Sequence, residues 1–245
     1  MAKIEVICKH CNSNKVNKAG QRILKSKPES VQTYRCKNCG KYFQLEYKQI
    51  GRLPETKEAI IDMCSNGSGI RDTARVLKIS TSTVINTIKK RASKLLKCNW
   101  QMLQSMSHVV LMPLMLELDE QWSFVKNKKQ QRWLWLALCH KTGQIVAYCL
   151  GRRTDDTFLL LLKTLQCFNV ELCFTDDWGS YSRLIPEKYH QIGKRNTQRI
   201  ERKFLTFRTR IKRLARKTIC FSKSILMHDS VIGIFINKVE WGYNI

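Results

Sequence analysis

Residues 114–125 read LMLELDEQWSFV, and this stretch decides the fold of the larger part of the chain. Leu114, Leu116 and Leu118 alternate with other residues, which is the period of a β-strand with one buried face. Asp119 follows directly on this apolar run. The stretch therefore predicts a core strand that presents an acidic side chain where its apolar part ends.

The segments that follow predict the rest of a sheet. Two apolar runs, 132–140 and 144–150, are joined by Lys-Thr-Gly at 141–143, so a hairpin is expected. Helices and strands then alternate: helix 155–165, strand 171–175, short helix 180–184, brief strand 190–193 and long helix 197–217. Three antiparallel strands followed by this alternation predict an α/β domain with a mixed sheet and helices on its faces.

Acidic residues are scarce in this part of the chain, so their positions are informative. Asp176 comes directly after the predicted strand 171–175, and side chains at strand ends converge across a sheet. Glu201 is the only acidic residue between Glu187 and Asp229, a stretch with 13 Lys and Arg. It flanks an apolar stripe, so we expect it at the sheet margin, with Arg208 on the same edge. The stripe consists of Ile200, Phe204, Phe207, Ile211 and Leu214.

Three carboxylates at a sheet edge suit one kind of chemistry. Asp119, Asp176 and Glu201 could hold two Mg²⁺ or Mn²⁺ ions about 3.5–4 Å apart, which is the arrangement that catalyses phosphoryl transfer. Mg²⁺ prefers oxygen ligands, and the surrounding basic residues would bind DNA phosphates.

The same carboxylates have simpler interpretations. Glu201 could pair with a nearby cation, Asp119 competes with neighbouring glutamates for the ligand role, Asp176 competes with Asp177, and Asp155 could be only a helix cap. The cations near Glu201 are Lys194, Arg202 and Arg208, and the glutamates near Asp119 are Glu117 and Glu120.

The first fifty residues contain two Cys-x-x-Cys pairs, Cys8 with Cys11 and Cys36 with Cys39, separated by 24 residues. Paired cysteines are the usual source of four thiolates around one Zn²⁺ ion. A block with few large apolar residues cannot build its own core, and bound zinc would supply the missing folding energy. We therefore predict a zinc-ribbon DNA-binding domain over 1–50, the alternative being four unrelated reduced cysteines.

Residues 54–97 have the pattern of a helix-turn-helix. A helix is predicted to start at Pro54, a short helix spans 71–77, and a third helix is capped by Ser80 or Thr81. The third helix would present polar and basic residues to DNA. These residues are Thr83, Asn86, Thr87, Lys89, Lys90 and Arg91. The alternative is an ordinary three-helix bundle with a solvated basic face.

The charge of the chain points to a polyanionic partner. The formal net charge is +25, with 21 basic and 7 acidic residues in 1–97 and 23 and 12 in 98–245, so both halves share the excess. Nucleic acid is the usual partner of such a chain, and a hydrophobic content of 43% excludes a disordered protein. A membrane is the weaker alternative, because no apolar run is long enough to span one and no signal sequence is visible. We expect an intracellular protein whose 11 cysteines stay reduced.

Several motifs resemble the transposases of the insertion-sequence-one family, in matching order and spacing over nearly the whole chain. The N-terminal half resembles the family in its paired cysteines and in Thr73-Ala74-Arg75. The rest of the resemblance lies in the stretches 118–122, 131–134, 175–178 and 197–202, and in the tail motifs 221–224, 228–229 and 231–233.

The resemblance implies a DDE transposase whose catalytic domain, here 110–245, has a ribonuclease-H-like fold. The family's catalytic carboxylates correspond to Asp119, Asp176 and Glu201, and the basic residue seven positions after the glutamate corresponds to Arg208. One departure is Asp177, which stands where the family has Gly and leaves the metal ligand to be Asp176 or Asp177. We favour Asp176 because it follows Thr175 as in the family.

Such a protein would bind the terminal inverted repeats of its element and carry out DNA strand cleavage and transfer, using two Mg²⁺ (or Mn²⁺) ions and one structural Zn²⁺. Its partners would be double-stranded DNA and other copies of the chain, in a homodimer or larger assembly, with no membrane involved. We expect it in the prokaryotic cytoplasm at the nucleoid. The competing hypotheses are a non-catalytic DNA-binding regulator and a structure-specific nuclease that cuts without joining.

Overall fold

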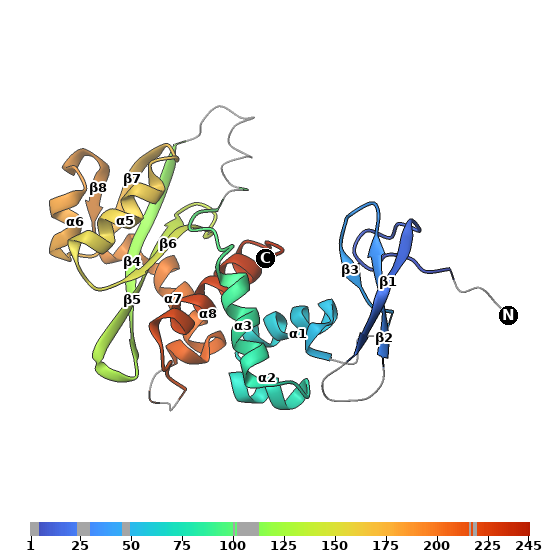
Figure 1. Ribbon diagram of the computed structural model, residues 1–245. Helices are drawn as coiled ribbons and strands as arrows, with labels where there is room; N and C mark the ends of the chain where they lie inside the picture. Colours follow the sequence, from blue (N-terminus) through green and yellow to red (C-terminus); the bar gives the residue numbers. More distant parts are fainter. Residues whose placement is uncertain are drawn as a thin grey trace. The chain divides into compact units, whose positions relative to one another are not determined.

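The computed structural model describes residues 5–23, 30–45, 50–99, 101, 113–215, 217 and 220–245 (Figure 1). The chain divides into two units, Met1–Thr56 and Lys57–Ile245. Each unit is described separately below.

The first unit is a three-stranded antiparallel sheet. Strand β1 (Val16–Ile23) pairs with β2 (Ser30–Cys36), which also pairs with the two-residue strand β3 (Tyr42–Phe43). A 3-10 turn, η1 (Ile50–Arg52), follows. The described buried cluster of this unit is small, as expected for a block that cannot build a full core. It consists of Cys8, Tyr34, Cys36 and Phe43.

The larger unit contains a five-stranded mixed sheet in the order β6-β5-β4-β7-β8. The first three strands in sequence are antiparallel neighbours: β4 (Leu114–Val125), β5 (Asn127–Cys139) and β6 (Ile145–Gly151). Strand β7 (Val170–Thr175) pairs in parallel with β4, and β8 (His190–Ile192) pairs in parallel with β7. The predicted mixed sheet is confirmed, with β4 at its centre.

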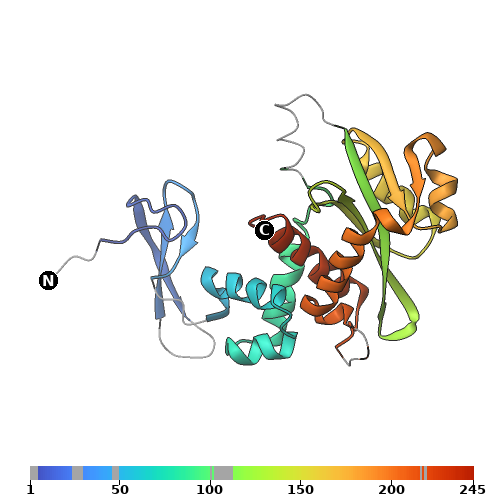
Figure 2. The ribbon, with the colours of Figure 1, turned by 180° about the vertical axis from the view of Figure 1, so that it is seen from behind.

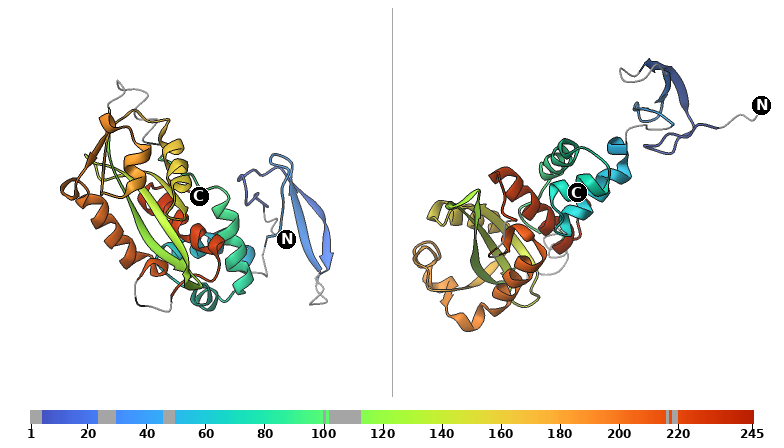
Figure 3. Two further views of the ribbon diagram at one scale, coloured as in Figure 1. Left: turned by 90° about the vertical axis from the view of Figure 1, so that its left-hand side faces the viewer. Right: turned by 90° about the horizontal axis from the view of Figure 1, so that it is seen from below.

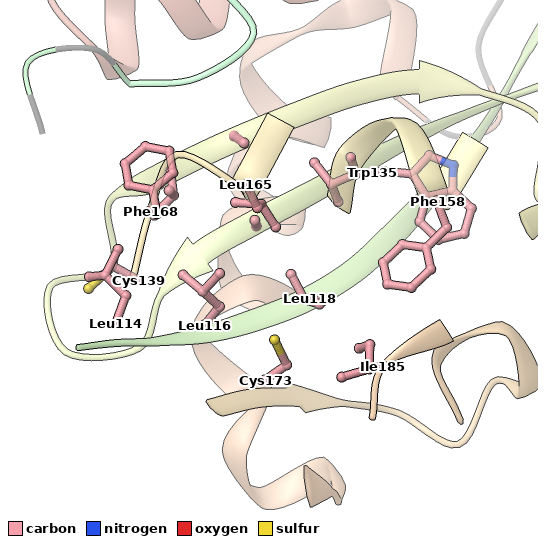
Figure 4. Packing of buried hydrophobic residues seen from close by; sticks show 14 of the residues in the cluster. Leu114, Leu116, Leu118, Trp135, Cys139, Phe158, Leu165, Phe168, Cys173 and Ile185 are labelled. Atoms are coloured by element: carbon pink, nitrogen blue, oxygen red, sulfur yellow. The ribbon is translucent and has the colours of Figure 1, made fainter. Parts of the chain in front are cut away.

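Helices cover both faces of this sheet (Figures 1 and 2). Helix α5 (Asp155–Leu165) and the short helix α6 (Gly179–Leu184) pack on one face. Figure 4 shows Leu116 and Leu118 of β4 in this cluster, with Trp135 of β5 and Phe158 of α5. Helix α7 (Gln198–Arg210) and helix α8 (Ile225–Phe235) pack on the other face. Short turns complete the unit: η2 (Glu187–Tyr189), η3 (Lys194–Asn196), η4 (Lys212–Leu214) and the π-helical turn η5 (Ile236–Glu240).

Helix α7 is shorter than predicted. The sequence predicts one helix over 197–217, but α7 ends at Arg210 because Ile211 adopts an extended conformation with φ −104° and ψ 94°. The chain continues as the turn η4, so that Ile211 and Leu214 still reach the core. All five residues of the predicted apolar stripe are buried.

Three helices precede the sheet in sequence: α1 (Pro54–Ser65), α2 (Ile70–Val76) and α3 (Thr81–Ala92). Ser80 is the N-cap of α3, and its side chain accepts a hydrogen bond from the Thr83 N–H at 3.1 Å. Helix α8 packs against these helices, as Figure 3 shows, and shares a core with them. The helix-turn-helix of this chain is therefore fused to the sheet domain through α8.

The segment after α3 also connects the three helices to the sheet. The Tyr148 N–H donates to the carbonyl of Lys97 at 3.0 Å, and the Asn99 N–H donates to the carbonyl of Val146 at 2.8 Å, so the segment pairs with the edge strand β6. The rest of the predicted connection 98–110 lies outside the described residues, apart from Gln101. None of the helices in the described ranges is both long enough and apolar enough to cross a bilayer.

Candidate functional site

Asp119 lies within the central strand β4, and Asp176 directly follows the end of the neighbouring strand β7. Strands β4 and β7 are parallel, and Glu117 pairs with Phe174. This register, continued by two residues past the paired segment, aligns Asp119 with Asp176, and the negative charge of Asp176 acts on Asp119. Asp177 is one residue out of this register and is exposed. The geometry therefore favours Asp176 over Asp177 as the partner of Asp119.

The face to which Asp119 belongs is the one covered by α7. Its neighbours in the alternation, Glu117 and Gln121, both bond to α7: Glu117 accepts the Ile200 N–H at 3.0 Å, and the Gln121 side chain donates to the Phe204 carbonyl at 3.3 Å. Leu116 and Leu118 point to the opposite face. Asp119 thus faces the helix that carries Glu201.

The electrostatics of Asp119 link it to both other carboxylates. Burial, which has the largest effect, and the negative charges of Glu120, Asp176 and Glu201 together raise the pKa of Asp119 to about 7, against a lowering by the Glu120 N–H. Like charges held together in this way favour a bound cation, because the cation would remove their repulsion. The donor set, three carboxylates, fits Mg²⁺ or Mn²⁺.

The site is open. Asp176 is half-buried and accepts the Trp178 N–H at 3.1 Å, while Glu201 is exposed, more than the sheet-margin position predicted for it. The alternative in which Glu201 only pairs with a nearby cation is not observed among the described residues, because none of their ion pairs shorter than 4.0 Å involves Glu201. Arg208 is half-buried two turns further along α7.

The glutamates that compete with Asp119 are held by protein groups. Glu117 is 0% exposed and binds His140 at 2.7 Å in addition to Ile200. Glu120 is buried as well, and it accepts hydrogen bonds from the Tyr181 hydroxyl at 2.5 Å and the Arg153 Nε at 2.7 Å. These interactions occupy both carboxylate oxygens of Glu117 and of Glu120. From the sequence, both glutamates were only alternatives to Asp119 as a metal ligand. Their hydrogen-bond partners could not be predicted, because these partners are distant in sequence.

Asp155 is not the N-cap of its helix, which was the alternative interpretation of this residue. Thr154 is the N-cap of α5, and the Asp155 carboxylate bonds to the side chains of Ser180 and Arg183 on α6. The hydrogen bond from the Arg183 guanidinium, which has the largest effect, and the one from the Ser180 hydroxyl lower the pKa of Asp155. Asp155 therefore joins α5 to α6 and is not part of the site.

In the first unit, four thiols are gathered. The sulfur atoms of Cys8, Cys11, Cys36 and Cys39 all lie within 4.8 Å of one another, the only such group of three or more potential ligands among the described residues. The Sγ–Sγ distances are 3.7 Å for Cys8 and Cys39 and 3.5 Å for Cys11 and Cys36. Sulfurs about 2.3 Å from a tetrahedral Zn²⁺ ion are about 3.8 Å apart, so the set fits zinc. The Cys39 N–H is the main cause that lowers the pKa of Cys36 to about 6. For Cys11 the Ser13 N–H lowers the pKa, but burial and the bonds to the other three cysteines outweigh it and raise the pKa to about 11.

Helix α3 presents four of its six predicted DNA-contacting residues. Asn86, Lys89 and Lys90 are exposed and Thr83 is half-buried. The other two predicted residues are less accessible in the structure, and their contact with DNA stays a prediction. Thr87 is buried, and the Arg91 guanidinium is held by the Glu58 carboxylate and the Ile245 carbonyl.

Two segments of the chain match families of known proteins. The profile of a family described as IS1 transposase matches residues 112–242, and one described as InsA C-terminal domain matches residues 47–92. Insertion element iso-IS1n protein InsB of Shigella dysenteriae is 58% identical over 127 residues, 52% of this chain and 97% of the relative. Insertion element IS1 protein InsB of Shigella sonnei is 44% identical over 121 residues, 49% of this chain and 92% of the relative.

Proposed function

The chain belongs to the IS1 transposase family, and we propose that it is the DNA transposase of its own insertion element. In this role it binds the terminal inverted repeats, cuts the DNA at the element ends and joins the freed 3′-hydroxyls to target DNA. The observation that carries the proposal is the electrostatic interaction of Asp119 with both Asp176 and Glu201, together with the strand register that aligns Asp119 with Asp176.

The fold supports the proposal. An order of β6-β5-β4-β7-β8, with three antiparallel strands followed by two parallel ones, is the arrangement expected of a ribonuclease-H-like domain. We propose such a domain over 110–245, a helix-turn-helix domain over 54–97 and a zinc ribbon over 1–50. The core that α8 shares with α1–α3 lies within one structural unit, Lys57–Ile245.

The carboxylates would hold two Mg²⁺ or Mn²⁺ ions. Such ions activate a water or hydroxyl for attack and stabilise the leaving oxygen in an in-line displacement at phosphorus. Asp176 is oriented for this task by the Trp178 N–H. The buried charge of Glu120 adds to the attraction of Asp119 for a cation. Arg208 would contact a DNA phosphate on the same edge. No covalent protein–DNA intermediate is needed, because the attacking group is a water or a 3′-hydroxyl.

The four cysteines would bind one structural Zn²⁺, and the first unit together with α3 would bind the element ends. Because two ends must be processed together, we propose a homodimer or larger assembly on double-stranded DNA. The proposed place of action is the cytoplasm, at the nucleoid. A net charge of +25 supports a DNA partner.

The proposal is tested by incubating the purified protein with DNA that carries the ends flanking its gene, in Mg²⁺ or in EDTA. We expect cuts at the element ends in Mg²⁺ alone. Binding of these ends without any metal-dependent cut would refute the enzymatic proposal and favour a regulator.

The raised pKa of Asp119 predicts a pH dependence of metal binding. Only the ionised carboxylate binds a metal, and the pKa of about 7 means that the proton occupies Asp119 increasingly as the pH falls below that value. The affinity for Mn²⁺ should therefore be constant above pH 7 and fall by up to about tenfold per pH unit below it. Calorimetric titrations between pH 5.5 and 8.5 measure this. An affinity that does not change over this range would contradict the assignment of Asp119.

Two neighbouring residues of α3 should affect DNA binding in different ways. Asn86→Ala should weaken binding to the element ends by about 1–3 kcal/mol with little effect on unrelated DNA, because an amide reads base edges. Lys89→Ala should weaken binding to both DNAs and reduce the slope of log K against log salt by about 0.9, because it removes one phosphate contact. Fluorescence anisotropy at several salt concentrations measures both, with the exposed Lys163→Ala on α5 as the control. Equal losses on both DNAs for Asn86→Ala would exclude base reading by this helix.

A further inference from the structure

Glu117 is an unusual residue for a central strand. It is 0% exposed, and it lies two residues before Asp119 on the same face of β4. Burial of a carboxylate is costly unless protein groups satisfy both oxygens, and here they do. One oxygen (Oε2) accepts the Ile200 N–H at 3.0 Å, and the other (Oε1) bonds to the His140 Nδ1 at 2.7 Å.

The bond to Ile200 fixes the start of α7. The first N–H groups of a helix have no carbonyl partner within the helix, and the positive end of the helix dipole favours a carboxylate there. The N-cap residue Thr197 makes no side-chain cap bond to this helix, so Glu117 supplies the cap from the neighbouring strand. Ile200 directly precedes Glu201. This hydrogen bond therefore attaches Ile200, the residue before the proposed ligand Glu201, to β4, the strand that carries the proposed ligand Asp119.

His140 connects the same point to β7. The backbone N–H of His140 donates to the Met115 carbonyl of β4 at 2.8 Å. The centroid of its ring lies 4.6 Å from that of the Phe174 ring. Phe174 is opposite Glu117 in the strand register and two residues before Asp176. The Glu117–His140 pair thus contacts all three elements that carry the proposed ligands: β4, β7 and α7.

We propose that Glu117 and His140 form a positioning pair that sets the spacing of Asp119, Asp176 and Glu201 for the metal ions, without binding the metal themselves. The inference rests on the proposed function, because it gives the pair a role in that same site. Groups that support metal ligands in this way are typically worth about 10- to 100-fold in metal affinity.

The experiment compares three variants of the full chain. Glu117→Ala removes both bonds. Glu117→Gln keeps an oxygen for the Ile200 N–H and an N–H for the imidazole, which can present a lone pair at Nδ1 in its other neutral tautomer. Asn237→Ala is the matched control: Asn237 is also 0% exposed, and its side chain bonds to the backbone of Leu96 and Gly233, away from the site. Hydrogen–deuterium exchange reports on residues 198–204, and electron paramagnetic resonance of free Mn²⁺ reports on metal affinity.

We expect Glu117→Ala to raise amide exchange in residues 198–204 at least about tenfold and to weaken Mn²⁺ binding by about 10- to 100-fold. Glu117→Gln should stay within about threefold of the wild type in both measurements. Asn237→Ala should lose thermal stability without changing either one. His140→Phe, which keeps an aromatic ring against Phe174 but loses the bond to Glu117, should weaken Mn²⁺ binding in the same direction as Glu117→Ala.

Two results would overturn the inference in distinguishable ways. If the wild type binds Mn²⁺ and Glu117→Ala binds it equally well, the pair has no positioning role, although the proposed function stands. If the wild type binds no Mn²⁺, the metal site of the proposed function fails, and the positioning role fails with it. Should Glu117→Ala not fold, His140→Phe and Glu117→Gln decide by the same two readouts. Unchanged Mn²⁺ affinity in His140→Phe, or a loss of Mn²⁺ affinity in Glu117→Gln of about tenfold or more, contradicts the account.

Discussion

Asp119→Ala, Asp176→Ala and Glu201→Ala are each expected to reduce metal-dependent DNA cleavage by more than about 10³-fold. The ions contribute several kcal/mol to transition-state stabilisation, each 1.36 kcal/mol is a factor of ten in rate, and the loss of any one ligand disrupts the pair of ions. Cleavage of end-labelled DNA in Mg²⁺ and in Mn²⁺ measures the effect. Binding of the element ends should survive, because the proposed DNA-binding residues lie on α3 and in the first unit.

The matched control is Asp177→Ala. Asp177 is adjacent to Asp176 and exposed, but it is out of register with Asp119, so this variant should cleave within about threefold of the wild type. The comparison also decides between the two candidates for the second ligand. Full activity in Asp176→Ala together with inactivity in Asp177→Ala would show that the register argument fails.

Removal of the proposed zinc ion is expected to unfold the first unit. The apparent binding free energy of structural zinc is about 10–16 kcal/mol, and the small cluster of Cys8, Tyr34, Cys36 and Phe43 cannot replace it. Cys36→Ser or a strong chelator should therefore abolish the β-sheet signal of residues 5–45 and specific binding to the element ends. Circular dichroism and zinc analysis of the purified protein measure the loss.

Two observations serve as controls for this prediction. The exposed Cys167→Ser on the larger unit should have no effect on zinc content. The melting temperature of the larger unit should not change on chelation, because the described residues of that unit contain no cluster of cysteines that could hold a metal ion. A zinc content of zero in a fully folded wild type would reject the metal centre.

The central strand of the fold could be predicted from the sequence because its pattern is local. The alternation at 114–125 marks β4 with the bounds that the structure has, and Asp155–Leu165 is likewise the helix expected from its amphipathic pattern. Helix α8 gives no such signal. It is buried on two sides, with Ile232 and Phe235 in the sheet core and Val231 and Ile234 in the core of α1–α3. Apolar residues therefore lie on more than one side of the helix, and its sequence shows no clear amphipathic period.

Two residues of the candidate site could be predicted from the sequence because each follows an apolar run of a strand. Asp119 and Asp176 follow apolar runs, and parallel pairing brings such positions together. The environment of each residue depends on contacts that are distant in sequence. Arg91 has the residue type and position of a DNA contact, but it is occupied by Glu58, 33 residues earlier, and by Ile245, 154 residues later. Thr87 is buried on the side of the helix that the core of α1–α3 and α8 uses.

The most direct test of the central proposal is strand joining by the wild-type protein. Element ends already cut to expose their 3′-hydroxyls would be mixed with a target plasmid, Mg²⁺ and the protein. The account predicts products in which the 3′ end of the element is covalently joined to target DNA, and none when the ends carry a 3′-deoxynucleotide. Cutting of uncut ends without joining of these precut ends would contradict the transposase proposal and indicate a nuclease.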